Sequence, residues 1–164
     1  MPGNSRSVFA MLALSLCLLA GCTHGNRRAP MEPPVERVGI VEEHWPNGKL
    51  RVRKEVIRAP EGTSVDHGLY TQWYTSGRKE YEAVFVRGKV HGVETQWHRN
   101  GQKRTEQHYD HGLRQGPRYC WDQDGRKRKE EHYVKDQPDG AWTIWDKNGR
   151  IKWQGAFDKG VPLP

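Results

Sequence analysis

Aromatic residues and glycines recur along this chain at a fixed spacing, with charged and polar residues between them. From residue 68 onward, four columns return every 24 residues in four copies without an insertion. Two columns are glycine: Gly68, Gly92, Gly116 and Gly140, and Gly77, Gly101, Gly125 and Gly149. Two are aromatic: Trp73, Trp97, Trp121 and Trp145, and Phe85, Tyr109, Tyr133 and Phe157. Self-similarity at one such period predicts a stack of repeated structural units.

The aromatic residues alone recur every 12 residues, so each unit divides into two halves of equal length. A helix of average length, about 11–12 residues, leaves no room for a connection, whereas a strand of about 5–6 residues and a turn fit. Pairs such as Asn100-Gly101 and Asp124-Gly125 are typical of hairpin turns. The pattern therefore predicts an all-β protein, an elongated antiparallel β-meander of 24-residue hairpin repeats in a single-layer twisted sheet.

The length of the turn decides which face of the sheet each aromatic column occupies. A three-residue turn with glycine at a bulge keeps Trp97 and Tyr109 on one face, whereas a two-residue turn places them on opposite faces. We expect the three-residue turn. One face then carries a ladder of aromatic rings, and the other carries mostly charged side chains.

The repeat domain is expected to occupy residues 39–164, after a signal peptide (1–21) and a flexible tether (22–38) that contains three prolines. Its units are 39–67, 68–91, 92–115, 116–139 and 140–164. The first unit is degenerate, because extra residues before Gly68 predict a longer loop. Its Trp45, Gly48 and either Val56 or Ile57 stand at the repeated positions, and the sequence leaves the pairing of this unit open.

The repeated unit resembles MORN repeats, and more closely the bacterial MORN repeat variants, in its tryptophan and in the spacing of its glycines. The resemblance covers residues 45–160, with one further departure at Asp136, which stands in a column of glycines. It implies a repeat module that binds or scaffolds and does not catalyse. Proteins with such variants are often labelled antitoxin components of toxin–antitoxin systems. The resemblance therefore also implies an alternative role, as an antitoxin or immunity protein that covers a partner toxin.

The beginning of the chain has the pattern of an export signal. A segment with Arg6 precedes an apolar run of 13 residues, shorter than the ~20 residues of a membrane-spanning helix and typical of a secretory signal. The run ends in Leu19-Ala20-Gly21-Cys22, which resembles the lipobox of bacterial lipoproteins. The resemblance implies cleavage before Cys22 and its modification with a diacylglyceryl group and a further acyl chain such as palmitate. The alternative is a plain signal peptide whose cysteine is accidental.

Several acyl chains on Cys22 would anchor the protein stably to a membrane without spanning it. The expected location is the bacterial cell envelope. Thr23 follows the cysteine, and by resemblance to enterobacterial sorting this residue implies the outer membrane. The exported address argues against nucleic acid as a partner.

Composition and charge narrow the picture further. Only 34% of the residues are hydrophobic, against about 45–50% in ordinary domains, which argues against a thick core. Aromatic residues make up 10% of the chain, which argues against disorder. Without residues 1–21, 26 basic and 20 acidic side chains leave a formal charge of +6. We expect a partner that is a protein or an anionic component of the envelope.

Repeated charges and tryptophans are the candidate binding residues. The basic rows are Lys79, Lys103 and Lys127, and Arg78, Arg126 and Arg150; the acidic row is Glu82, Glu106 and Glu130. These rows form either a self-neutralising solvated face or a strip for anionic headgroups. The tryptophan column either packs on neighbouring strands or forms an aromatic groove. Trp142 and Trp153, present only in the last unit, either cap the sheet or form a contact patch.

The sequence gives little evidence for a metal site or for catalysis. His67 and His91 share a column, as do His108 and His132; column neighbours two strands apart lie about 9.6 Å from each other, too far for zinc ligands. His108 and His111 are close in sequence, but no third ligand is evident, so neither metal nor cofactor is expected. Cys120 is left without an intrachain partner. No catalytic motif occurs, and an unrecognised envelope enzyme is the last alternative.

Overall fold

A computed structural model describes residues 37–59 and 61–164. Their regular elements are the strands β1 (Arg37–His44), β2 (Leu50–Arg58), β3 (Ser64–Trp73), β4 (Lys79–Val86), β5 (Lys89–Val90), β6 (Gly92–Trp97), β7 (Lys103–Asp110), β8 (Leu113–Trp121), β9 (Lys127–Val134), β10 (Gln137–Pro138), β11 (Gly140–Trp145), β12 (Ile151–Asp158) and β13 (Val161–Pro162). The predicted signal peptide, the lipobox with Cys22, and the tether up to residue 36 lie outside the described residues.

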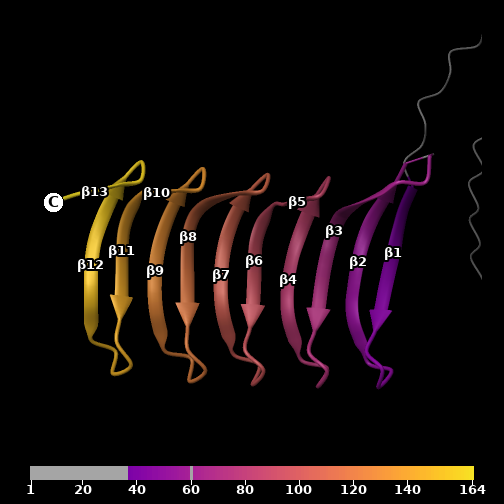
Figure 1. Cartoon of the computed structure of the whole chain (residues 1–164), viewed down its shortest axis with the longest axis horizontal. Coiled ribbons are helices and arrows are strands. Elements are labelled where there is room, and N and C mark those ends of the chain that lie inside the picture. Colours follow the sequence, from indigo (N-terminus) through magenta and orange to yellow (C-terminus); the bar gives the residue numbers. More distant parts are fainter. Residues whose placement is uncertain (1–36, 60) are drawn as a thin grey trace, which may run out of the picture. The chain divides into compact units, whose positions relative to one another are not determined.

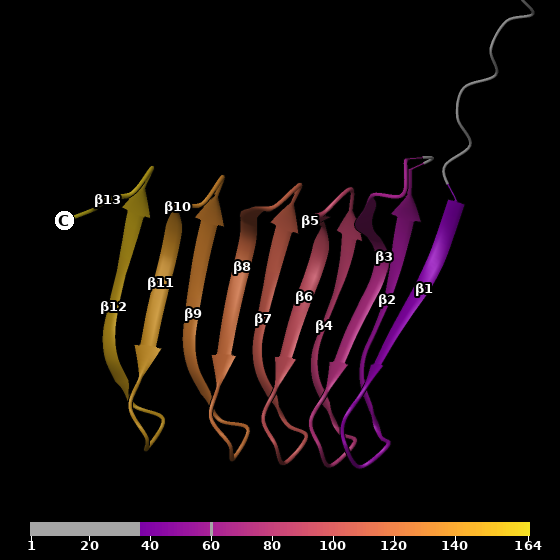
Figure 2. The same ribbon diagram turned by 45° about the vertical axis from the view of Figure 1, so that its right-hand side comes forward.

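The strands form one open antiparallel sheet in which sequence neighbours are also neighbours in space (Figure 1). The order across the sheet is β1-β2-β3-β4-β6-β7-β8-β9-β11-β12-β13, with β5 paired to β4 and β10 paired to β9. A second view shows the same succession of hairpins in a single layer, with strongly curved strands (Figure 2). The predicted all-β meander of hairpin repeats is confirmed.

Two kinds of turn alternate along the sheet. At one rim, Asp146 donates its N–H to the carbonyl of Arg150 at 2.8 Å, and Gly149 donates to the carbonyl of Asp146 at 3.1 Å. This is a three-residue turn, as predicted, and Gly149 supplies the positive φ of +79° that it needs. At the other rim, two-residue turns such as Arg87-Gly88 have both residues at positive φ, which matches the twist of a hairpin.

A β-bulge follows each three-residue turn and reverses the expected facing of the aromatic columns. Gln96 pairs with Thr105, but Trp97 pairs with Lys103, so Arg104 is an extra residue on β7. The same shift recurs between β3 and β4, β8 and β9, and β11 and β12. Because one extra residue inverts the alternation of side chains, Trp97 and Tyr109 lie on opposite faces. The prediction of one aromatic face and one charged face was therefore wrong, although the turn length was right.

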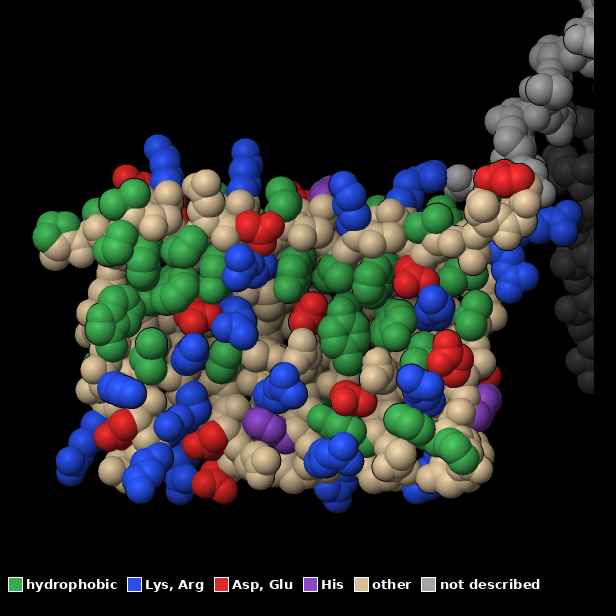
Figure 3. Space-filling view, in the orientation of Figure 1, with side chains coloured by type: hydrophobic (Ala, Val, Ile, Leu, Met, Phe, Trp, Pro, Cys, Tyr) green, Lys and Arg blue, Asp and Glu red, His purple; other side chains and the backbone are tan. Residues whose placement is uncertain are grey.

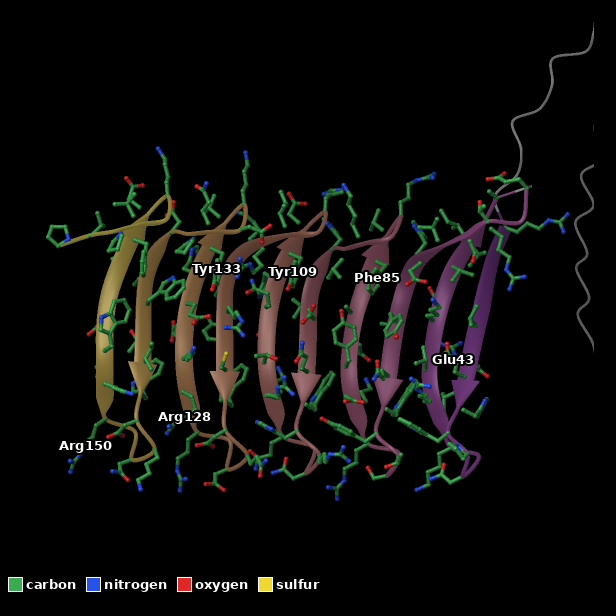
Figure 4. All side chains as sticks on the ribbon, viewed as in Figure 1. Glu43, Phe85, Tyr109, Arg128, Tyr133 and Arg150 are labelled. Atoms are coloured by element: carbon green, nitrogen blue, oxygen red, sulfur yellow. The ribbon has the colours of Figure 1, made fainter. Side chains whose placement is uncertain are left out.

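Ring contacts show the two faces directly. One, the tryptophan face, carries the column Trp73, Trp97, Trp121 and Trp145, and the ring of Trp121 lies 5.8 Å from that of Tyr119 two residues before it. The other, the belt face, carries the column Phe85, Tyr109, Tyr133 and Phe157. Figure 4 shows Phe85, Tyr109 and Tyr133 in one row. In the same view, hydrophobic side chains form a band across the upper half of the face, with charged side chains gathered below it (Figure 3).

Burial is concentrated on the belt face. Val56 and Ala83 are 1% exposed and Tyr133 is 5% exposed, and the register places all three on this face. Tyr70 packs against Tyr81 and Phe85, with ring centroids 5.6 Å apart in both cases. Aromatic pairs of this kind on adjacent strands each stabilise a sheet by about 0.2–1 kcal/mol. The belt face therefore supplies the thin core that the composition allows.

The degenerate first unit forms an ordinary hairpin, with Gly39 opposite Val56 just as Gly68 is opposite Phe85. Val56, rather than Ile57, thus takes the second aromatic position. Trp45 donates its N–H to the carbonyl of Lys49 at 2.8 Å, which is the bond that Tyr74 makes to Arg78 in the next unit. Trp45 therefore corresponds to Tyr74, one position beyond the tryptophan column. Strand β1 begins at Arg37, two residues before the predicted boundary.

Candidate binding surface

The repeated lysines and tryptophans of the tryptophan face are engaged with one another. Lys79 bonds Glu82 at 2.5 Å, and the equivalent lysines pair with Glu106 and Glu130 at 2.5 and 2.9 Å. The Nζ of Lys79 lies 5.7 Å from the ring centroid of Trp97 in the following unit, within the range of a cation–π contact. The Nζ of Lys127 likewise lies 5.9 Å from the ring centroid of Trp145. These rows therefore neutralise one another and cover part of the tryptophan column.

Trp142 and Trp153 lie instead on the belt face, beside Phe157. The indole N–H of Trp142 donates to the carbonyl of His132 at 3.1 Å, and its ring lies 4.8 Å from that of Phe157. Trp153 lies 6.1 Å from Phe157 and remains 41% exposed. The six tryptophans singled out in the sequence are thus divided between the two faces, and whether they contact a partner stays a prediction.

A polar depression occupies the middle of the belt face, across β6, β7 and β8. It has a volume of about 700 Å³. We call it the arginine groove and define it by Glu94, Arg104, Gln107, Tyr109, Arg114 and Arg118. Arg104 also borders two adjoining depressions, so it stands at the centre of the hollowed part of this face.

The three arginines of the groove differ in their partners. Arg118 bonds Glu131 at 2.5 Å, and Glu131 is 4% exposed. Arg114 bonds Asp136 through Nε at 2.9 Å, and its guanidinium lies 4.1 Å from the ring centroid of Tyr133. Arg104 is exposed, and its side chain has no hydrogen bond or ion pair with the residues that the structure describes. Arg104 is therefore the guanidinium available to a ligand, while the other two are held in place.

Burial shapes the remaining groups in the groove. Desolvation raises the pKa of Tyr109, so its hydroxyl stays protonated and can donate. The groove also contains two buried oxygens, Thr105 Oγ1 and Gln107 Oε1, that have no hydrogen-bond partner within the described part of the chain. Buried polar atoms of this kind are uncommon in folded proteins. They give the wall of the groove a polar character.

Cys120 lines the same groove from β8, opposite Thr105. Burial raises the pKa of its thiol, and this effect exceeds the opposing effect of the arginine nearby at position 118. A thiol that stays protonated at neutral pH is a poor nucleophile. In this environment Cys120 acts as a strand side chain.

Sequence reasoning missed the arginine groove because it followed the columns that repeat in kind. The bulge position of successive units holds Glu80, Arg104, Arg128 and Lys152. This column holds one acidic residue followed by three basic ones, and it matches no motif. The only available signal was the run of arginines at 104, 114 and 118 within one unit and the start of the next. Without knowledge of the bulge and the turn, the sequence does not show that these three arginines lie on the same face of the sheet.

Comparison with known proteins supports the repeat. Residues 90–111 match the MORN repeat variant family. The matched stretch contains the β6–β7 hairpin, with its tryptophan, its three-residue turn and its second aromatic. None of the curated proteins compared with the chain matches it. Within residues 37–59 and 61–164, no helix is long and apolar enough to cross a bilayer.

Proposed function

We propose that this chain is a lipid-anchored protein of the bacterial cell envelope that binds an anionic partner on its belt face. The resemblance of Leu19–Cys22 to a lipobox supports an anchor on Cys22, and Thr23 supports the outer membrane. The match to the MORN repeat variant family supports a repeat-based binding or scaffold module. Attachment through acyl chains would hold the sheet close to the phosphates of the envelope surface.

The observation that carries the proposal is the arginine groove with its unpaired Arg104. A guanidinium presents donors in a planar fork that fits the oxygens of a phosphate or carboxylate. Arg114 and Arg118 each hold a carboxylate, which neutralises their charge and fixes the shape of the site around Arg104. The aromatic rings above the groove offer flat apolar area for the uncharged part of a ligand. Phosphate-bearing envelope glycans combine these two features.

The groups in the groove favour binding over catalysis. Its carboxylate, Glu94, is engaged by the hydroxyl of Tyr81 at 3.2 Å and by the amide of Gln96 at 2.9 Å. The thiol of Cys120 has a raised pKa. A nucleophile within reach of a base, which covalent chemistry needs, is not formed by these groove side chains. The proposed role is accordingly non-catalytic.

The experiment measures binding of a water-soluble, deacylated, phosphate-bearing envelope glycan to the full chain in detergent by calorimetry. We expect Arg104→Ala to weaken binding about tenfold or more, because a hydrogen bond between charged groups is worth about 1.5–3 kcal/mol. We expect the affinity to fall as salt is raised.

The matched control is Arg126→Ala, which removes the same charge from an exposed turn where Arg126 pairs with Asp124. Equal loss in both variants, or unchanged binding of the dephosphorylated glycan, would contradict the groove as an anion site. If co-expression with a neighbouring gene reveals toxicity that this chain relieves, the antitoxin role would replace the one proposed.

A further inference from the structure

Two histidines and an aspartate meet at the rim of the two-residue turns, where β5 approaches the turn after β7. His111 Nδ1 lies 2.6 Å from Asp110 Oδ1, and His91 Nδ1 lies 3.4 Å from the same oxygen. The two imidazole rings are 4.7 Å apart. One possible ligand atom from each residue lies within 4.8 Å of the others. The sequence alone separates His91 from His111 by 20 residues, so it did not bring them together.

The backbone needs only a hydrogen-bond acceptor at the position of His91. His91 Nδ1 accepts the N–H of His111 at 3.4 Å, just as His67 Nδ1 accepts the N–H of Arg87 at 3.3 Å in the preceding unit. In the following unit, the acceptor of the equivalent hydrogen bond is an amide oxygen: Gln115 Oε1 accepts the N–H of Lys135 at 3.1 Å. An imidazole is therefore not required there by the fold.

The turn residue His111 also differs from the residues at the equivalent position of the other units. The equivalents of His111 are the cations Arg87, Lys135 and Lys159. A valine that ends the strand precedes Arg87 and Lys135, whereas an aspartate precedes His111 and Lys159. Only at His111 does this aspartate adjoin a histidine at the turn position. The seam between His91 and His111 thus combines three metal-ligating side chains where the neighbouring seams place a cation. The repeat itself offers no structural reason for this combination.

We propose that His91, Asp110 and His111 bind a divalent transition-metal ion of the zinc type through two imidazole nitrogens and one carboxylate. Ligand atoms about 2.0–2.2 Å from a tetrahedral zinc ion lie roughly 3.4 Å from one another. His91 and Asp110 already have this separation of 3.4 Å. Metal binding through His91 Nδ1 releases the backbone N–H of His111 to solvent, and the His111 side chain moves outward and exchanges its hydrogen bond to Asp110 for the metal. The neutral imidazole nitrogen is a preferred ligand for zinc, nickel and copper.

Exposure makes this rearrangement easy. The side chains of His91, Asp110 and His111 are 45%, 62% and 65% exposed, so their rings can turn without repacking a core. Three protein ligands leave the fourth position of a tetrahedral ion open. Water or a side chain from a partner protein can fill it. The three residues are not among those that line the arginine groove, and the site does not depend on the function proposed above.

The test is calorimetric titration of the full chain with zinc chloride, with any polyhistidine tag removed. We expect one ion per chain. His91→Ala, Asp110→Asn and His111→Ala should each lower the affinity by at least about tenfold. His67→Ala is the matched control, because His67 makes the same backbone bond in the preceding unit but has no histidine across the seam; its affinity should equal that of the unsubstituted chain.

A second variant tests the geometry by building the site anew. Val86→Asp together with Arg87→His places the same three residue types around His67, and we expect the folded double variant to bind two ions per chain. The visible absorption of bound Co²⁺ should double in parallel. The proposal is overturned if His67→Ala weakens binding as much as His91→Ala, if the three ligand variants bind zinc unchanged, or if the folded double variant still takes up one ion.

Discussion

Asp136 shows how a single side chain can replace a glycine in this fold. It occupies a turn position where other units have Gly88, Gly112 and Gly160, and it adopts the same left-handed backbone, with φ of +69°. Such a backbone is unfavourable for most side chains, and Asp and Asn tolerate it best. The carboxylate accepts the backbone N–H of Arg114 at 3.0 Å and its Nε at 2.9 Å. The side chain thus binds the turn to the preceding unit.

The stabilising effect of Asp136 should depend on pH. The backbone N–H and the guanidinium of Arg114 hold the pKa of Asp136 below its usual value. A carboxyl with a depressed folded-state pKa stabilises the fold above its unfolded pKa of about 3.9 and loses this effect as pH falls through the folded value. We expect the difference in unfolding free energy between the unsubstituted chain and Asp136→Asn to be constant from about pH 7 to pH 5 and to shrink below about pH 4.

Asparagine is the suitable comparison because it tolerates the same backbone and keeps an acceptor oxygen. Urea unfolding at several pH values gives the two free energies. A difference that persists undiminished at pH 3, or that grows on acidification, would show that the ion pair with Arg114 is not what Asp136 contributes.

At the scale of the element, the sequence predicted the hairpins, the positions of both turns and the length of the three-residue turn, because glycine and the aromatic spacing report directly on backbone conformation. It did not predict the bulge. The extra residues are Glu80, Arg104, Arg128 and Lys152, whose polar types are equally at home in a regular strand. Since one extra residue exchanges the two faces, this omission misplaced the tryptophan column and concealed the arginine groove.

Gly101 tests the turn itself. Its φ is +94°, and an added Cβ would meet only the side chain of Arg78, at 3.8 Å. Any loss on substitution is therefore a backbone effect. We expect Gly101→Val to lower the unfolding free energy by about 1–3 kcal/mol, and Gly101→Asn to lower it less, because asparagine tolerates positive φ. Chemical denaturation of both variants measures the two losses, and equal losses would refute the assigned turn.

At the scale of the whole sheet, each hairpin contacts the hairpins before and after it in the chain. The order of the strands could be predicted because an unbroken repeat allows few other arrangements. The two edges of the sheet differ in the residues that they expose. On β1, Val38 and Ile40 are 71% and 54% exposed; at the opposite edge, Pro162 follows Val161 and has no N–H to offer another strand.

A sheet built from nearest-neighbour contacts should tolerate the loss of one whole unit. We expect deletion of residues 92–115 to leave a cooperatively folded chain, with the denaturant m-value lowered by roughly a fifth because less surface is exposed on unfolding. Deletion of residues 92–113 leaves the columns two residues out of step and should abolish cooperative unfolding. Circular dichroism during urea titration distinguishes these results. Identical behaviour of the two deletions would mean that the 24-residue register is not what joins the units.

The open strand order has a mechanical consequence. Arg37 lies in one edge strand and Pro162 in the strand at the opposite edge, so tension applied between them acts along the rungs of the ladder and loads them one at a time. Such a sheet peels from its ends at low force instead of resisting until it shears as a whole. A pull on either end would lengthen the protein in steps, one hairpin per step, while the hairpins farther in keep their shape.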